Sequence, residues 1–279
     1  MTNIFNYIDR PSPIHALTGA TKLICVLLWS FAAMLTYDTR LLLFMPLLSV
    51  GLFAISKIKV KDVSFMLGFT AAFMVLNNLM IFLISPQHGV TVYGSRHLVF
   101  AAAGEIGRYT LTWEQLLYHA NLFLKYLSTI PIILLFVCTT NPSEFAASLN
   151  RVGVKYSIAY SVALALRYIP DIQQEYHEIS QAQQARGIEM SKKETIVKRL
   201  KSASAILIPL ILSSMDRIEV ISNAMELRGF GKNKKRTWYM GRKFSGADIA
   251  AMALSAVLLL LSIGLNVWNG SRYWNPFLS

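Results

Sequence analysis

Five long runs of apolar residues divide the chain, and each approaches the roughly 20 residues that an α-helix needs to cross a bilayer. The link between the first two runs is tight, which predicts a helical hairpin. The second run is the shortest of the set. The five runs are Thr18–Tyr37, Leu41–Ser56, Val63–Ile84, Leu116–Val137 and Ile249–Val267. The pattern predicts an all-α, polytopic membrane protein with about five transmembrane helices.

Charge separates one part of the chain from the rest. Most of the basic residues lie within residues 139–245, and Lys57, Lys59 and Lys61 lie in the link after the second run. Positive charge marks the cytoplasmic side of a membrane protein. Counting spans from either region gives the same topology, with the amino terminus inside and the carboxyl terminus outside.

The apolar runs and the charge together predict three parts. Residues 1–138 hold the first four transmembrane helices. Residues 139–245 form a cytoplasmic helical coupling domain with two long helices, each ending in an Arg-Gly motif. Residues 246–279 hold the last transmembrane helix and a tail. The link at 85–114 is long and mixed, and we expect a short strand or a re-entrant piece there.

Local capping patterns within the basic segment predict where its helices begin. Asn141–Glu144 has the N-cap, the proline and the acidic residue of a helix start, which predicts a short helix to about Asn150. A longer helix is predicted to begin near Lys155. Ser191–Glu194 has the pattern of a capping box and predicts the start of a second long helix.

Both long helices change character along their length. The front half of each is apolar on all sides but too short to span a membrane, and the back half carries an apolar stripe at helical spacing. Pro170 and Pro209 lie near these changes. The stripes are Ile169, Ile172, Tyr176 and Ile179 in the first helix, and Ile211, Met215, Ile218 and Met225 in the second.

The two helices end in the same sequence motif, called here the repeated phrase. Ile179–Gly187 reads ISQAQQARG and Ile221–Gly229 reads ISNAMELRG, so Ile, Ser, Ala, Arg and Gly recur in register. One interpretation is generic helix termination, because glycine is a common C-cap and a cation suits the negative end of the helix dipole. The other is a pair of docking tips, because an arginine fork can grip a carboxylate with two hydrogen bonds. Two such tips would suit a partner with two like subunits.

Composition supports a membrane protein. The chain is 54% hydrophobic and 15% charged, with a net charge of +12, and its mean hydropathy is +0.45. A soluble domain of this size could not bury that much apolar surface. The positive charge could indicate nucleic-acid binding, but it lies between apolar runs, which favours cytoplasmic loops over a nucleic-acid site.

The basic region resembles the transmembrane T component of energy-coupling factor (ECF) transporters, the EcfT/CbiQ-type permeases, which are a class of ABC importer. The amino-terminal third is similar mainly in hydropathy, although Lys22 and Leu23 keep part of a family pattern before the first span. The second motif reads Leu-Arg-Gly where the family often has Ala-Arg-Gly. The stretches that carry the resemblance are TTNPSEFAASLNRVGV (Thr139–Val154), LALRYIPDIQQE (Leu164–Glu175), QAQQARGIEM (Gln181–Met190) and AMELRGFG (Ala224–Gly231).

This resemblance implies a function and partners. The chain would be a non-catalytic coupling subunit in a prokaryotic plasma membrane, joining two ABC ATPase subunits to a small membrane S component that binds a vitamin or metal ion. The apolar front halves of the long helices would face the S component. The residues implied to dock the ATPases are Ala185, Arg186 and Gly187 in the first motif, and Leu227, Arg228 and Gly229 in the second.

Sequence motifs for catalysis or for a bound cofactor are missing. No GxxxxGK[ST] loop, HExxH or GxSxG motif occurs, and the five histidines lack metal-ligand spacing. We therefore expect no enzyme activity, cofactor or metal in this chain. Lys125 is a charge inside a predicted span, with Asn121 one turn before it and Asn77 and Asn78 at similar depth. We expect it to be structural, either snorkelling to the interface or lying in a polar cluster between helices. An autonomous insertase or channel is the alternative function, and co-purifying ATPases would distinguish it from a coupling subunit.

Overall fold

A computed structural model describes residues 10, 12–99, 111–187, 196–232, 237–238 and 241–276. The regular elements among these residues are α-helices, accompanied by two isolated β-bridges. The all-α prediction is therefore confirmed. The chain separates into two compact units, Met1–Asn141 with Arg242–Ser279 as unit 1 and Pro142–Gly241 as unit 2.

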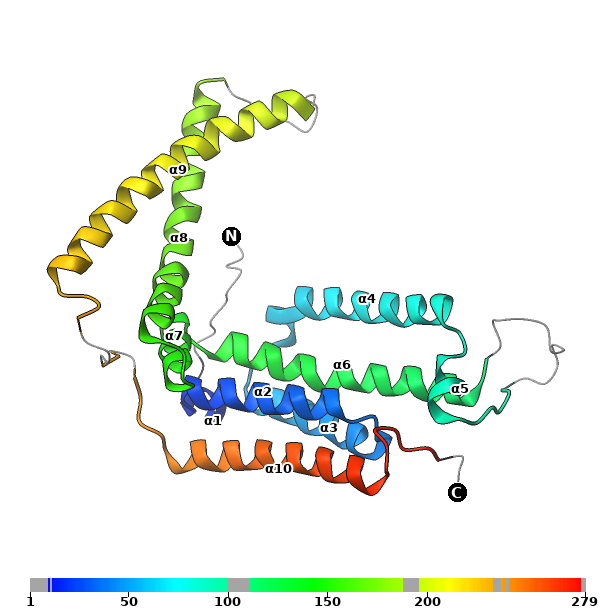
Figure 1. Cartoon of the computed structure of the whole chain (residues 1–279). Helices are drawn as coiled ribbons and strands as arrows, with labels where there is room; N and C mark the ends of the chain where they lie inside the picture. The colour runs from blue at the N-terminus through cyan, green and yellow to red at the C-terminus, as the bar shows by residue number, and fades with distance from the viewer. Residues whose placement is uncertain are drawn as a thin grey trace. The chain divides into compact units, whose positions relative to one another are not determined.

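Unit 1 contains a helix at each of the five predicted apolar runs (Figure 1). Three of them are long and apolar enough to cross a membrane, and two have 17 residues each. This set agrees with the prediction of a polytopic membrane protein. The three longer helices are α4 (Val60–Ile84), α6 (Trp113–Thr139) and α10 (Gly246–Trp268), and the two shorter ones are α2 (Gly19–Leu35) and α3 (Thr39–Ile55).

Apolar packing holds the helices of unit 1 together. Helix α10 packs on α2, and both α2 and α3 pack on α6. The main core cluster contains Trp29, Ala32, Met45 and Leu258, whose side chains come from α2, α3 and α10. Alanine at position 32 has no exposed surface and allows close helix approach. Helix α4 is peripheral, because only 6% of its apolar window is buried.

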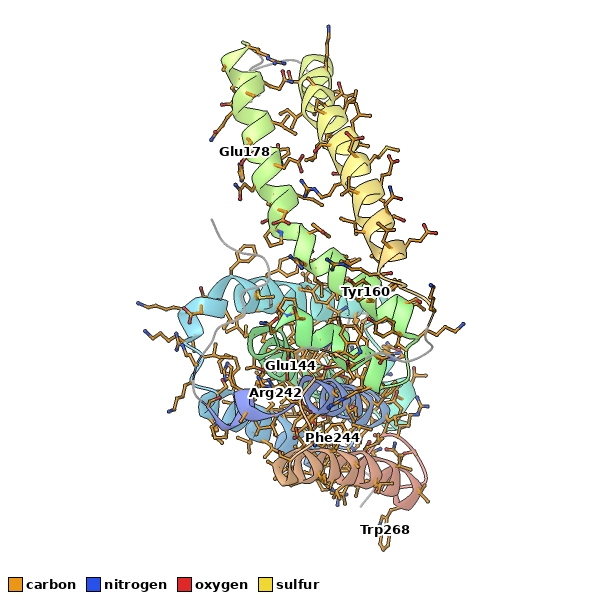
Figure 2. The ribbon with its side chains drawn as sticks, turned by 90° about the vertical axis from the view of Figure 1, so that its left-hand side faces the viewer. Glu144, Tyr160, Glu178, Arg242, Phe244 and Trp268 are labelled. Carbon is orange, nitrogen blue, oxygen red and sulfur yellow. The ribbon has the colours of Figure 1, made fainter. Side chains whose placement is uncertain are left out.

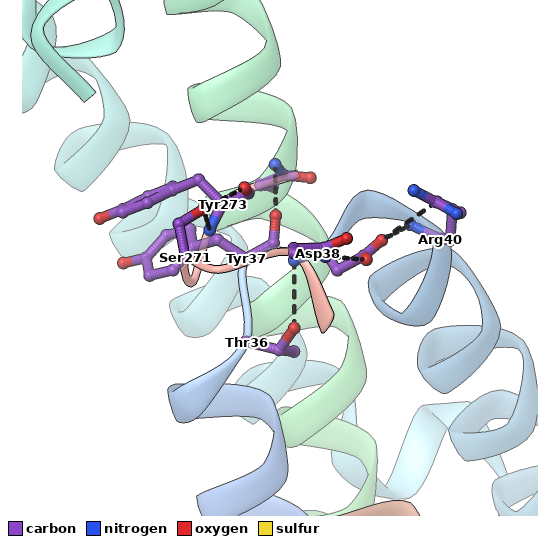
Figure 3. Close-up of polar contacts among 8 residues, drawn as sticks. Thr36, Tyr37, Asp38, Arg40, Ser271 and Tyr273 are labelled. Carbon is purple, nitrogen blue, oxygen red and sulfur yellow. Dashed lines mark hydrogen bonds and ion pairs between the residues drawn. The ribbon is translucent and has the colours of Figure 1, made fainter. Parts of the chain in front are cut away.

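A polar corner joins α2 to α3 and makes the predicted hairpin (Figure 3). The Asp38 carboxylate accepts a hydrogen bond from the Arg40 backbone N–H at 3.0 Å and thereby caps α3, while the Asp38 N–H donates to the Thr36 hydroxyl at 3.1 Å. The carboxyl-terminal tail lies over this corner, where the Tyr37 N–H donates to the Arg272 carbonyl at 2.8 Å. The corner is thus held by local caps and by the tail together.

Two short helices are also described in unit 1. Helix α1 is Pro13–Ala16, and helix α5 is His88–Tyr93 in the long link before α6. A single bridge, Leu98 to Thr112, is the β-structure described in that link. The alternative of a short strand or a re-entrant piece is therefore resolved, for the described part, as a short helix and one bridge.

Polar side chains from α6 and α10 cap the end of α2. The last carbonyls of a helix have no partner within the helix, and lipid supplies none, so donors from neighbouring helices satisfy them. This requirement explains why polar residues occur inside otherwise apolar spans. The donors are Ser262 to the Ala32 carbonyl (3.0 Å), Lys125 to Met34 (3.2 Å) and Asn266 to Leu35 (3.1 Å). Asn121 donates to the Tyr37 carbonyl (3.4 Å) in the corner that follows α2.

Lys125 does lie in a polar cluster between helices, and the contacts described for it are with Met34 of α2 and with Tyr37. Besides the bond to α2, its ammonium lies 3.2 Å from the centroid of the Tyr37 ring. Asn77 instead accepts from the Tyr126 hydroxyl at 3.2 Å, and Asn78 pairs with His119 at 2.9 Å. The asparagines of α4 are therefore held by α6 residues other than Lys125, because helix packing turns Lys125 toward α2.

Substitution of Lys125 by methionine is expected to have a small effect. The change removes one cap from α2, and single polar contacts in membrane helices contribute about 1 kcal/mol or less. We expect a slightly lower melting temperature of the purified protein and nearly normal amounts in the membrane. Loss of transport in a Lys125→Met chain that is stably assembled would instead indicate a functional charge.

Three helices are described in unit 2, and the first two begin where the sequence signals placed them. They are α7 (Pro142–Arg151), α8 (Tyr156–Ala185) and α9 (Ile196–Leu227). Helix α8 continues through Pro170 and α9 continues through Pro209. The capping-box pattern predicted before α9 lies outside the described residues. The two long helices carry the repeated phrase, so unit 2 contains the candidate site.

Candidate functional site: two Arg-Gly helix ends

Helices α8 and α9 run antiparallel, so their two C-terminal ends, which carry the Arg-Gly motifs, lie far apart (Figure 1). Near the end of α8 the Gln183 side-chain amide donates to the Ala205 carbonyl, in the first third of α9, at 3.2 Å. At the other extreme the rings of Tyr160 and Phe230 are 4.7 Å apart, centroid to centroid. Tyr160 lies near the beginning of α8, away from Glu178 (Figure 2). The end of α9 therefore lies beside the start of α8, and the end of α8 lies beside the first third of α9.

The antiparallel arrangement separates the two arginines. A helix rises about 1.5 Å per residue, so Tyr160 and Arg186 are on the order of 40 Å apart along α8. Arg228 lies two positions before Phe230, which contacts Tyr160. The two motifs thus form two separate tips at opposite ends of the pair, and one small binding surface could not hold both.

The Arg228 tip is a complete glycine cap. Gly229 has a φ of +65°, a left-handed conformation that suits glycine. Its N–H donates to the Glu226 carbonyl at 2.8 Å, and the Phe230 N–H donates to the Met225 carbonyl at 2.9 Å. These two bonds define a Schellman motif, which satisfies the last carbonyls of α9.

The Arg186 tip has the same backbone geometry in its described part. Gly187 has a φ of +83°, and its N–H donates to the Gln184 carbonyl at 2.9 Å. Arg186 is the C-cap residue of α8, and its N–H donates to Gln183 at 3.1 Å. Both glycines therefore terminate helices as the generic interpretation expects. These caps use backbone groups alone, so they leave the arginine's docking role open.

The side chains at both tips face outward. Ala185, Arg186 and Gly187 are exposed at the first tip, and Arg228 is exposed at the second. Leu227 is 90% exposed, an unusual position for a large apolar side chain beside a charge. The second tip therefore offers a partner an apolar contact that Ala185 does not supply at the first.

A polar clamp fixes the crossing of α8 and α9. The Glu175 carboxylate accepts hydrogen bonds from the Ser213 hydroxyl and from the Arg217 guanidinium, the latter at 2.8 Å. The Arg217 guanidinium also lies 5.9 Å from the Tyr168 ring centroid. Sequence analysis did not identify this clamp, since no local pattern links an acid on one helix to a base on another.

An apolar groove of about 680 Å³ lies between the two helices. Residues of both predicted stripes line it, among them Ile172, Ile218 and Met225. The apolar front half of α9 is divided: Ile206 is buried, whereas Leu207 and Leu212 are about half exposed, at 47% and 57%. Unit 2 thus presents more apolar surface than its own helices cover.

Across the ranges that the structure describes, no three histidine, cysteine, aspartate or glutamate side chains lie close enough together to hold a metal ion. The chemistry available at the tips is therefore recognition by charge, hydrogen bonding and apolar contact.

Comparison with known proteins identifies the family. Residues 10–239 match the CbiQ family model, described as cobalt transport protein. The chain is 27% identical to the "energy-coupling factor transporter transmembrane protein EcfT" of Heliobacterium modesticaldum, over 92% of this chain and 95% of that protein. It is 24% identical to the protein of that name from Bacillus subtilis, over 92% and 97%. The match includes both Arg-Gly ends and most of the chain, and it shows that the chain belongs to the CbiQ family of cobalt transport proteins.

Proposed function

We propose that this protein is the transmembrane coupling (T) subunit of an ECF-type ABC importer. The observation that carries the proposal is the pair of exposed Arg-Gly motifs. Each follows the C-terminal end of its helix, and they lie at opposite ends of the antiparallel α8–α9 pair. The family match and the names of the EcfT relatives support it. In this role the chain is a non-catalytic subunit, and ATP hydrolysis takes place in its partners.

Two ATPase subunits are the proposed partners of the tips. The tips repeat the same residues and the same glycine cap, so they suit two similar surfaces. Their separation, on the order of 40 Å, matches two neighbouring subunits better than one socket. Each guanidinium would pair with a carboxylate in its ATPase, with the glycine allowing the partner's backbone to approach closely.

A small membrane S component is the proposed partner of the apolar surface of unit 2. The exposed apolar residues of α9 and the groove beside α8 are unfavourable in water, and the front halves are too short to span a membrane. Contact with an apolar membrane protein would cover them. The S component would carry the vitamin or metal ion, so the substrate site lies outside this chain.

The proposal is tested by purification of the tagged chain from its own membranes. A coupling subunit should bring with it ATPase subunits in a ratio of two per chain, together with a small membrane protein. An autonomous insertase or channel would purify without ATPases, and that result would overturn the proposal.

The topology is a further expected result, in which residues 139–245 and the Lys57–Lys61 link are cytoplasmic. Cysteines placed at the exposed positions Lys61 and Lys232 should be shielded from an impermeant thiol reagent in right-side-out vesicles, and one at Ser271 should react. Native Cys25 and Cys138 are first replaced. Labelling of the Lys232 position from outside would put the tips on the wrong side of the membrane for any ATPase.

A further inference from the structure

The chain connects its two units twice, leaving unit 1 after α6 and returning to it before α10. We call these two connections the passages, and the unit 1 helix at each of them is hydrogen-bonded to the first turn of α2. Unit 1 stops at Asn141, just after α6, and resumes at Arg242, just before α10. The first turn of α2, Thr18–Lys22, contacts the end of α6 and the start of α10 through buried polar groups. We name this segment the anchor turn.

The end of α6 is held by a buried lysine. The Lys22 ammonium donates to the carbonyl of Thr139, the last residue of α6, at 2.8 Å, and Lys22 is only 4% exposed. A cation at this place satisfies a carbonyl that has no partner within its helix and suits the helix dipole. Burial of an ammonium is unfavourable unless it is well paired, so this contact demands a well-defined position of α6.

The start of α10 is held by a buried aspartate. One oxygen of the Asp248 carboxylate accepts from the Ser245 N–H at 2.7 Å and caps α10, and the other accepts from the Thr18 N–H at 2.8 Å. Asp248 is 1% exposed. One carboxylate therefore joins the start of α10 to the start of α2 with charge-assisted hydrogen bonds.

The two contacts converge on a single helical turn. The Lys22 N–H donates to the Thr18 carbonyl at 3.1 Å, so the backbone of the anchor turn is itself hydrogen-bonded. Thr18 and Lys22 are both buried. The places where the chain leaves unit 1 and returns to it are thus fixed to the same rigid element.

We propose that Lys22 and Asp248 are positioning residues for coupling, which hold both passages so that displacement of unit 2 moves α6 and α10. A loose passage would absorb the displacement as local bending before it reached the membrane helices. The inference rests on the proposed function, because it assumes that unit 2 is driven by ATPases. Its structural part, the rigid anchor turn, can be tested without them.

The coupling test uses the complete complex in lipid nanodiscs and liposomes. Lys22→Met and Asp248→Asn should still bind ATPases and hydrolyse ATP, while substrate uptake per ATP falls by about five- to tenfold, which lies within the roughly 2- to 30-fold range of altered coupling. Lys22→Arg should restore most of the uptake, because it keeps the charge and the donors and a cavity of about 120 Å³ lined by Lys22 leaves room for it. The matched control is Lys125→Met, which makes the same substitution in a lysine that caps α2 at its other end.

Hydrogen exchange of the chain alone tests the anchor directly. Lys22→Met should exchange faster in peptides that contain Thr139–Asn141, and Asp248→Asn should exchange faster in peptides that contain Arg242–Asp248. Lys125→Met should change neither region. Unchanged exchange in both variants overturns the anchor, whether or not ATPases bind.

The outcomes separate the two proposals. Wild-type uptake per ATP in an assembled Lys22→Met complex would overturn the coupling role, and so would an equal loss in Lys125→Met, which would reflect general weakening of unit 1. If the wild-type chain brings down no ATPase, the proposed function fails and the coupling role fails with it. Faster exchange in the variants would then still establish the anchor turn as a structural element.

Discussion

A chain in which both Arg186 and Arg228 are replaced by alanine is expected to lose its ATPase subunits or to become uncoupled from them. Removing one side of a partly buried charge pair costs roughly 2–5 kcal/mol, because the other charge is left without a partner. Each single variant should weaken ATPase binding and still leave a complex, since the remaining tip keeps the second contact intramolecular. The measurement is co-purification of the ATPases, with substrate uptake, for both single variants and the double variant.

Two further variants make this experiment specific. Lysine at either position should substitute poorly, because a point charge does not reproduce the planar, two-pronged guanidinium. Arg167→Ala is the matched control, since Arg167 is an exposed arginine of α8 outside both motifs. All variants should reach the membrane, because these residues lie outside the spans. If the double variant binds its ATPases and transports like the wild type, the motifs serve as helix caps alone and the docking proposal is wrong.

Loss of the clamp at the crossing of α8 and α9 is expected to have the next largest effect. In Arg217→Met the Glu175 carboxylate, whose side chain is 17% exposed, keeps only its Ser213 partner in the clamp. Breaking a buried ion pair costs about 3–5 kcal/mol, but Arg217 is 35% exposed, and solvent reduces the expected loss to about 1–2 kcal/mol. We expect a lower melting temperature of the purified complex and reduced uptake per ATP, because the antiparallel pair would transmit movement less rigidly.

A double-mutant cycle tests the clamp. Arg217→Met, Glu175→Gln and the combined variant are compared by thermal unfolding, and the combined variant should be less destabilised than the sum of the single ones. Lys201→Met, which changes an exposed cation of α9, is the control and should leave stability nearly unchanged. Additive effects of the two single substitutions would mean that the pair does not act as a clamp.

Many of the helices and helix caps of this protein could be predicted from its sequence, because they depend on interactions between residues close together in the chain. A span must be continuously apolar over its whole length in lipid, so all five apolar runs became helices in unit 1. The cap signals at Asn141–Glu144 predicted the start of α7, and the structure begins that helix at Pro142. The glycines of the Arg-Gly motifs are likewise local, because a left-handed cap depends on the glycine itself.

Contacts between distant residues were decided by the tertiary structure. Lys22 and Thr139 are 117 positions apart, and Thr18 and Asp248 are 230 apart. Each pair meets only because α2, α6 and α10 pack side by side. The partners of Lys125 could not be predicted for the same reason, since depth in the membrane does not say toward which neighbour a side chain points.

The repeated phrase shows the division most clearly. The sequence alone determined that two helices end in Arg-Gly, because residue type and helical spacing act over a few positions. Only the tertiary structure decided that the helices run antiparallel and that the two tips lie at opposite ends of the pair. Helix direction in a pair depends on side-chain packing and on contacts such as Glu175 with Arg217, which no periodicity within one helix records.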